Sequence, residues 1–370
     1  MRTAVLFLLV CAGCGFHSVG GDGGDNDDMG VPSDLAGADL TGVPPGSDLS
    51  MGQTASCPGP ALLVGVENLT NSGSGGGRVA RVSFANGSAQ PCTTLSGQGL
   101  IGSQPMAVTA FGNGLVGAAT FDGLYVVDPT TDTVKWSKPN PNGANNWGPF
   151  DAFTVQSPSG TPYVAAAWGP DFGISGAGIR WVEIYDASGA AAPGAPYCIQ
   201  QTGCTDLGLS LGIYSMSSDP AAPAHLLALD GANSVAAAEV DPWAGPPTRT
   251  TYVGTYSEPL ASLYAVSVGG KPHLAWFVNN MAGGAIQWAI DDTGSAPPLA
   301  GPVRCTTNCD TMLHVVPDPS QQNGFFALCD AATTSGRTVV RADDAGSCTV
   351  ILDGTQFGAQ SRLSRLAVAP

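Results

Sequence analysis

Charged side chains are scarce in this 370-residue chain. They make up 11% of it, against about a quarter in an average soluble protein. Only three lysines occur, and 13 basic residues face 29 acidic ones, which gives a formal net charge of −16. Because nucleic-acid binding needs a concentrated Lys/Arg surface, we exclude nucleic acid as a partner.

Long hydrophobic runs are also missing. Beyond residue 13, no apolar run approaches the ~18 residues that a membrane-spanning helix needs. Hydrophobic residues nevertheless make up 43% of the chain, which is enough for a core and excludes global disorder. The 51 glycines and 29 prolines indicate many turns. The composition therefore predicts a turn-rich protein built mostly from β-strands.

The N-terminus has the features of an export signal. Met1 and Arg2 form a short positive region, residues 4–10 are apolar, and Cys11-Ala12-Gly13-Cys14 follows. An apolar run that closes on Ala-Gly-Cys resembles the lipobox of bacterial lipoproteins. This resemblance implies removal of residues 1–13, lipidation of Cys14 and, because Gly15 follows, delivery to the outer membrane or cell surface. An ordinary cleaved secretory peptide is the alternative.

The next segment has the composition of a disordered tether. Residues 15–56 contain seven aspartates and no lysine or arginine, among many glycines, serines and prolines. Such a segment repels itself and lacks the apolar residues for a core. We therefore divide the chain into a signal peptide at 1–13, a lipidated cysteine with an acidic tether at 14–56, and a globular domain at 57–370.

The cysteine content supports export independently. Without Cys11 and Cys14 an even number remains, as in proteins of oxidising compartments. Nearest-neighbour pairing predicts four disulfides: Cys57–Cys92, Cys198–Cys204, Cys305–Cys309 and Cys329–Cys348. A zinc site made by Cys305, Cys309, Cys329 and His314 is the competing interpretation.

A repeat of about 52 residues fills the globular domain. Each copy has a β-type segment that ends in an Asp or Asn turn. These segments lie at 79–84, 124–127, 181–185, 235–240, 286–290 and 338–342. A second apolar segment precedes each of them, at 61–66, 115–119, 163–168, 225–229, 273–277 and 325–329. A third begins near residues 106, 152, 212, 263 and 312, and its sixth copy is the C-terminal segment 365–369.

Four-stranded repeats of this length, closed by pairing of the N- and C-terminal strands, predict an all-β fold, a six-bladed β-propeller. Segment 123–136 resembles blades of the quinoprotein-like and lactonase-like propeller superfamilies. The resemblance is architectural and transfers no catalytic residue. Seven blades with one diverged, or two tandem β-sandwiches, are the alternative folds.

One face of the predicted propeller carries an oxygen-bearing side chain in every blade. These residues follow the second strand of each copy, where loops of a rigid scaffold commonly carry function. They are Glu67, Asn68, Asp122, Asp171, Asp230, Asn279, Asn280 and Asp330. Such a ring could bind calcium, as the resemblance to propeller lactonases implies. Ordinary turn chemistry explains the same residues, because Asp and Asn side chains cap tight turns.

Two functions remain open. We favour a non-enzymatic surface lipoprotein that presents its propeller to a surface protein, a glycan or a small ligand, with no cofactor. The alternative is a metal-dependent hydrolase of the lactonase kind. A serine hydrolase would need Ser210, in Gly208-Leu-Ser-Leu-Gly212, on a strand–turn–helix elbow with His225 as base, yet no helical pattern follows. We interpret His225, His273 and His314 as structural.

Overall fold

A computed structural model shows the arrangement of the globular domain, which belongs to one unit spanning Gln53–Pro370. The structure describes residues 61–68, 77–84, 90–95, 107–128, 131–143, 147–170, 178–209, 212–213, 215–219, 222–230, 234–244, 249–255, 260–268, 271–278, 285–287, 303–304, 309, 311–320, 324–330, 337–342, 348–357 and 361–369. Within these ranges the secondary structure is β-strand, with two short 3-10 helices at Gly112–Gly114 and Gly354–Phe357. No helix in the described ranges has the length and apolarity to cross a membrane.

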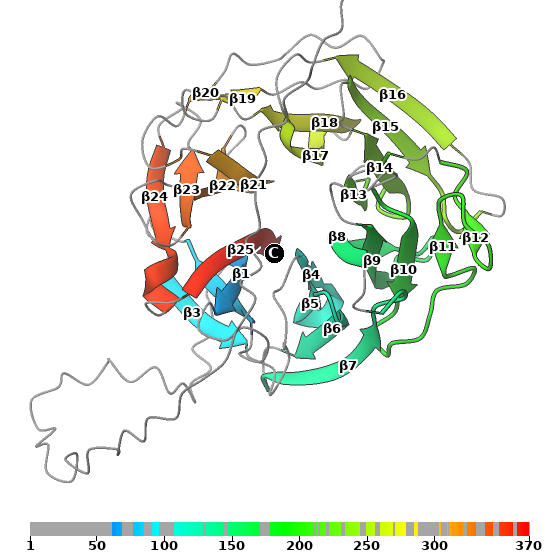
Figure 1. Cartoon of the computed structure of the whole chain (residues 1–370), viewed down its shortest axis with the longest axis horizontal. Coiled ribbons are helices and arrows are strands. Elements are labelled where there is room, and N and C mark those ends of the chain that lie inside the picture. Colours follow the sequence, from blue (N-terminus) through cyan, green and yellow to red (C-terminus); the bar gives the residue numbers. More distant parts are fainter. Residues whose placement is uncertain are drawn as a thin grey trace, which may run out of the picture. The chain divides into compact units, whose positions relative to one another are not determined.

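The strands form sheets, antiparallel in all but one strand pair, arranged around a common centre, which confirms the β-propeller arrangement (Figure 1). Five sheets have four strands each. The first contains β25 (Ser361–Ala369), β1 (Ala61–Asn68), β2 (Arg78–Ser83) and β3 (Gln90–Leu95), and the second β4 (Ala107–Phe111), β5 (Leu115–Ala119), β6 (Gly123–Asp128) and β7 (Thr133–Pro139). Another contains β13 (Ser215–Ser218), β14 (Leu226–Asp230), β15 (Ser234–Val240) and β16 (Arg249–Thr255), and the next β17 (Leu260–Val268), β18 (Lys271–Val278), β19 (Ala285–Gln287) and β20 (Val303–Arg304). The last of the five contains β21 (Thr311–Pro317), β22 (Phe325–Asp330), β23 (Thr338–Ala342) and β24 (Cys348–Asp353).

The remaining sheet departs from the predicted repeat. It has five strands, in the order β12 (Thr205–Asp206), β11 (Tyr197–Cys198), β10 (Trp181–Tyr185), β9 (Pro162–Pro170) and β8 (Trp147–Gln156). Its two outermost strands pair in parallel and are two residues long. The prediction of six blades is therefore corrected: five four-stranded blades are present in the described ranges, not six.

The sequence after β10 explains the departure. Pro193, Gly194 and Pro196 interrupt the chain where a fourth strand would run, because proline cannot donate to a strand ladder. The chain instead forms two short extended pieces, which the Cys198–Cys204 disulfide joins. The phenol of Tyr197 fastens this region by donating to the Pro193 carbonyl at 2.7 Å.

The predicted closure of the ring is confirmed. β25 pairs with β1 in antiparallel fashion, from Ala61 opposite Ala369 to Asn68 opposite Ser361. Residues of β1 alternate between two cores, because both faces of this sheet are covered. Leu62 and Val64 pack with the β21–β24 sheet, whereas Leu63 packs with the β4–β7 sheet.

The cysteine pairing was predicted only in part. Cys198–Cys204 forms as predicted, whereas Cys309 pairs with Cys329. The predicted pairs Cys305–Cys309 and Cys329–Cys348 are therefore wrong, as is the zinc interpretation that used Cys309 and Cys329 as ligands. Strand pairing is the physical reason: Cys329 lies one residue before the end of β22, and the segment just before β21 brings Cys309 to a Cα–Cα distance of 4.9 Å. Cys348 is also disulfide-bonded, and the Cys57–Cys92 pair lies outside the described side chains.

Aspartate turns join the strands as predicted. The Asp186 carboxylate accepts the backbone N–H groups of Ser188 and Ala190 at 2.8 and 3.0 Å. Gly189 completes this turn with a φ of +83°, in the left-handed region that glycine favours.

Closure by β25 is expected to carry much of the stability. Leu363, fully buried in β25, packs in the core between two sheets. We predict that Leu363→Ala lowers the free energy of unfolding by about 2–5 kcal/mol, because it deletes buried methyl groups and leaves a cavity. Urea unfolding followed by tryptophan fluorescence measures the change, and Lys135→Ala on the exposed side of β7 is the control, expected within about 0.5 kcal/mol of wild type. Equal effects of the two substitutions would contradict the proposed importance of closure.

Candidate functional site: the axial cavity

The structure describes part of the predicted oxygen-bearing face. Glu67 is 3% exposed, and its carboxylate accepts the Nε–H of Arg362 at 2.8 Å. Asp330 lies 3.4 Å from Nε of Arg337. These two carboxylates are thus held by arginines and are not grouped as ligands.

The other predicted residues of this face show turn chemistry or lie outside the described side chains. The backbone N–H of Asp122 donates to the Thr120 hydroxyl at 3.1 Å, and its carbonyl accepts the N–H of Asn140 at 2.9 Å. Only the backbone is described for Asn68 and Asp230, which end β1 and β14. Across the described ranges, no group of three or more His, Cys, Asp or Glu side chains is placed to hold a metal. Asp171, Asn279 and Asn280 lie outside the described residues.

A cavity of about 820 Å³ lies along the axis of the ring, among the innermost strands. Its walls come from β4, β8, β13, β21 and β25, the strands nearest the centre in Figure 1. Gly112, Gly160 and Pro319, in the connections between first and second strands, also line it. Because successive connections of an antiparallel sheet alternate between its two ends, this end lies opposite the predicted face.

Bulges in the inner strands precede three polar residues of the cavity. The register of β8 shifts between Pro149 and Asp151, and that of β21 between Met312 and His314. A third shift, between β1 and β25, directly precedes Arg365. A bulge bends its strand and re-aims the adjacent side chain. Asp151, His314 and Arg365 all line the cavity.

Asp151 is a carboxylic acid that titrates close to neutral pH. Its Oδ2 accepts the backbone N–H of Met216 at 2.8 Å, which ties β8 to β13. Burial raises the pKa of Asp151 to about 6, although hydrogen bonds from Met216 and Ser215 and the charge of Arg365 oppose the rise. A perturbed carboxyl in a cavity is a candidate functional group.

His314 faces the cavity as a neutral imidazole. Burial, and secondarily the positive charge of Arg365, hold its pKa well below the ordinary value of 6.5. Its Nδ1 accepts the backbone N–H of Leu366 at 3.4 Å, which leaves the ring proton on Nε2. Arg365 therefore provides a permanent positive charge, which acts to lower the pKa of both Asp151 and His314.

The remaining cavity wall is largely apolar. Val108 and Phe111 of β4, Phe153 of β8, Met216 of β13 and Val316 of β21 contribute to it. An apolar cavity with a few convergent polar groups is the usual form of a small-molecule site.

Sequence reasoning missed this site because it searched the loops. The available signal was in the inner strands, where a polar residue interrupts an apolar segment at intervals of about 52 residues. His314 and Arg365 follow this spacing, and Ser262 follows a register shift at the same place in β17. The interpretation of His314 as purely structural did not consider its position on the axis.

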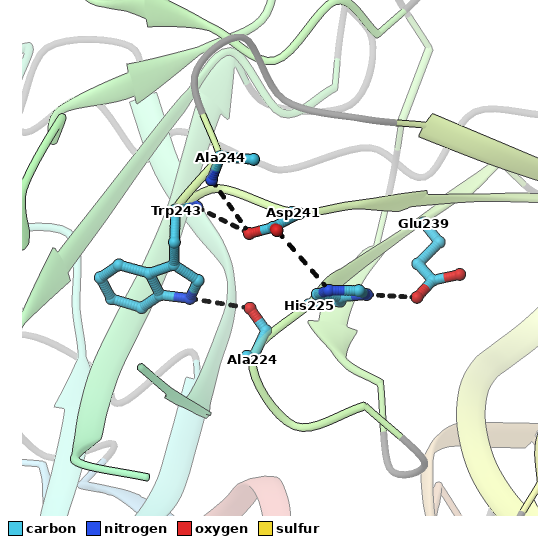
Figure 2. Close-up of polar contacts among 6 residues, drawn as sticks. All are labelled: Ala224, His225, Glu239, Asp241, Trp243 and Ala244. Carbon is cyan, nitrogen blue, oxygen red and sulfur yellow. Dashed lines mark hydrogen bonds and ion pairs between the residues drawn. The ribbon is translucent and has the colours of Figure 1, made fainter. Parts of the chain in front are cut away.

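A second histidine belongs to a compact polar cluster away from the axis (Figure 2). His225 lies just before β14, with Nδ1 against Oε1 of Glu239 and Nε2 3.8 Å from Oδ2 of Asp241. The other carboxylate oxygen of Asp241 accepts the backbone N–H of Trp243 at 2.9 Å. The Trp243 indole donates to the Ala224 carbonyl at 2.8 Å. These contacts join the segment before β14 to the end of β15 and the turn after it, which agrees with a structural role for His225.

Comparisons with known proteins support the fold. No protein-family model and no curated protein matches the chain. A crystal structure of a protein of unknown function from Bacteroides caccae is similar, with a TM-score of 0.50 and 12% identity over 84% of this chain and 98% of that one. A protein from Bacteroides fragilis that carries a provisional 6-phosphogluconolactonase name is similar with a TM-score of 0.47 and 10% identity, over 86% of this chain and 100% of that one. A Lactobacillus plantarum protein is similar with a TM-score of 0.44 and 11% identity, over 84% of this chain and 99% of that one. At these identities the likeness concerns the fold alone, which is a β-propeller.

The raised pKa of Asp151 predicts a stability cost at neutral pH. The folded-state pKa of about 6 exceeds the ordinary 3.8, so the contribution of Asp151 to stability is full below the ordinary value and is lost as pH rises through 6. Asp151→Asn retains an acceptor for Met216 and removes the charge. We expect it to stabilise the protein by about 1–2 kcal/mol at pH 7.5 and to have no effect near pH 4.

Asp318→Asn is the matched control, and its effect should have the opposite sign. Burial opposes ionisation of Asp318, yet hydrogen bonds from Ser320 and Arg341 outweigh it and lower the pKa. Its contribution to stability is therefore present above the ordinary pKa and is lost as pH falls through the lowered one. Urea midpoints between pH 4 and 8 measure both variants. A destabilised Asp151→Asn protein at pH 7.5 would contradict the electrostatic account of the cavity.

Proposed function

We propose that this protein is an exported lipoprotein whose propeller binds a small organic ligand, without catalysis, in the axial cavity. The observation that carries the proposal is the cavity itself. Its volume of about 820 Å³ falls within the range of about 300–1,000 Å³ typical of ligand sites.

The walls of the cavity suit a preformed binding site. The inner strands are fixed by pairing within their sheets, and β25 and β1 join the two ends of the ring. A ligand would therefore meet side chains that are already ordered, which reduces the entropic cost of binding.

The polar groups of the cavity favour binding over catalysis. Nδ1 of His314 accepts the Leu366 N–H, and the Asp151 carboxylate accepts the Met216 N–H. Both groups are thus engaged by backbone of neighbouring strands in a way that orients them. A general base needs a lone pair directed at the proton it removes, and the one ring lone pair of neutral His314 already accepts the Leu366 N–H.

Two kinds of observation support export. The leader ends in Ala12-Gly13, directly before Cys14, and the folded domain holds the Cys198–Cys204 and Cys309–Cys329 disulfides. Disulfides form and persist in oxidising compartments outside the cytoplasm.

Ligand binding in the cavity can be tested with a neutral fluorescent probe, N-phenyl-1-naphthylamine. The probe is titrated into the chain from Gly15 to Pro370, which is secreted without a lipid anchor so that no detergent competes for the probe. We predict saturable binding at one site. Ser218→Trp, which puts an indole at a cavity-lining position at the end of β13, should weaken it at least tenfold.

The control for this titration is Thr133→Trp, which adds the same side chain at an exposed position of β7, away from the cavity. It should leave probe binding unchanged. Absence of saturable binding, or equal binding by the Ser218→Trp protein, would overturn the assignment of the cavity as a ligand site.

The proposed anchor predicts a specific modification. In a bacterial host the full chain should incorporate labelled palmitate, and Cys14→Ser should abolish the label because the acylated thiol is gone. Cys11→Ser should retain it, since Cys11 leaves with the leader. Label that survives Cys14→Ser would contradict lipidation at this position.

A further inference from the structure

Arg365 is a positively charged residue of the cavity, and the carboxylate of Asp151 senses its charge without forming an ion pair with it. It lies in the middle of β25, opposite Gly65 of β1, and lines the cavity. Among the residues that the structure describes, its guanidinium forms neither a hydrogen bond nor an ion pair within 4 Å.

Other arginines of the domain have partners. Arg362 contacts Glu67 at 2.6 Å, Arg341 contacts Asp318 at 2.7 Å, and Arg337 donates to the Leu363 carbonyl at 3.0 Å. A guanidinium carries five N–H donors, and none of those of Arg365 is among the buried polar atoms without a partner, so they face the open space of the cavity. The unmatched donors of Arg365 are therefore available to an acceptor that enters the cavity.

The other ionisable groups of the cavity do not form an ion pair with Arg365 among the described residues. On β8, Asp151 is bonded to the Met216 N–H, and its charge is partly lost near pH 6. On β21, His314 is neutral, and on β2, Arg81 also lines the cavity but has an interaction of its own. β4 and β13 contribute uncharged side chains such as Thr109 and the serines of β13. The guanidinium of Arg365 thus remains open to an anion, most of all when Asp151 is protonated.

The walls beside Arg365 limit what kind of anion can bind. Val108, Phe153 and Met216 supply apolar surface from three different strands. Burying a matching apolar surface of the ligand would add roughly 25 cal/mol per Å². A small inorganic anion would leave these walls uncovered.

We infer that the ligand of the axial cavity is an organic anion, with a carboxylate or similar oxyanion bound by Arg365 and an apolar body packed against the inner strands. This inference rests on the proposed function, because it assigns the ligand class of the same cavity. Arginine suits this role because its planar fork matches two oxygens of a carboxylate or sulfonate.

The test compares two probes that share an apolar body and differ in charge. 8-Anilino-1-naphthalenesulfonate is the anionic counterpart of N-phenyl-1-naphthylamine, and both are titrated into the secreted chain. The anionic probe should bind more tightly to the wild type. Arg365→Met should weaken the anionic probe about 10- to 100-fold, the range expected for loss of charge-assisted hydrogen bonds, and should leave the neutral probe within about twofold.

Lys135→Met is the matched control for charge. It removes one positive charge from β7, where the Lys135 side chain is 47% exposed and distant from the cavity lining. Affinity for both probes should be unchanged in this variant, which separates a local effect of Arg365 from a change in net charge. Arg365→Lys retains the charge and loses the fork, so it should bind the anionic probe with intermediate affinity. This variant also serves the test if the Met variant does not fold.

The pH dependence provides a further arm of the same titration. Because the sulfonate stays ionised, its affinity should increase as pH falls through about 6, where protonation of Asp151 removes a competing negative charge. Asp151→Asn should abolish this increase. If the affinity of the Asp151→Asn protein for the anionic probe still increased fully as pH falls, the charge of Asp151 would not compete with the bound anion, contrary to this inference.

The outcomes test the anionic nature of the ligand separately from the proposed function, which is ligand binding in the cavity. Equal affinity for the two probes, with neither affected by Arg365→Met, would overturn the anion assignment and leave the cavity as a site for neutral ligands. Loss of saturable binding of both probes to the wild type would instead overturn the proposed function.

Discussion

Pairing of β25 with β1 is the interaction on which the other features of the domain depend. It joins residues at opposite ends of the chain and leaves β1 covered on both faces, with Leu62 in one core and Leu63 in another. A sheet with an exposed inner edge would present unpaired backbone groups to the axis. Closure removes that edge and also supplies Arg365, so the same strand provides both stability and the candidate ligand contact.

The candidate site results from small irregularities in an otherwise regular arrangement. Register shifts before Asp151, His314 and Arg365 occur in three different sheets at a similar depth. A bulge bends its strand and re-aims the adjacent side chain, and each of these three residues lines the cavity. A repeated bulge therefore allows an apolar repeat to carry polar side chains at its centre, while its two faces remain available for packing between sheets.

Much of the fold could be predicted from the sequence because the strands are buried on both faces and appear as continuous apolar runs. The first three strands of each repeat were located, including the terminal segment that closes the ring. The outermost strands were not located. They are short or half-exposed, as in β7, where exposed and partly buried residues alternate and two lysines occur. The five-stranded sheet was missed because nothing in periodicity predicts a parallel pair such as β11 and β12.

The site could not be predicted in the same way. Glu67 and Asp330 were identified as oxygen donors, but both are held by arginines: Glu67 by Arg362 of β25, far away in sequence, and Asp330 by Arg337 just before β23. Cys309 and Cys329 were paired incorrectly because proximity in sequence does not determine which strand ends meet. Asp151 and Arg365 were overlooked because a bulge is a feature of strand pairing, which a single sequence does not display.

The position of β25 has a consequence for how the protein is made. β1 lies near the start of the domain and its partner β25 follows all the other strands in the sequence, so the first sheet is completed only after the strands between them are present. Contacts of such high sequence separation form slowly. Until β25 has paired, the first sheet has an open inner edge at β1. A product truncated before Ser361 would lack the strand that pairs with the inner edge of β1, and its open sheet would be a substrate for proteases.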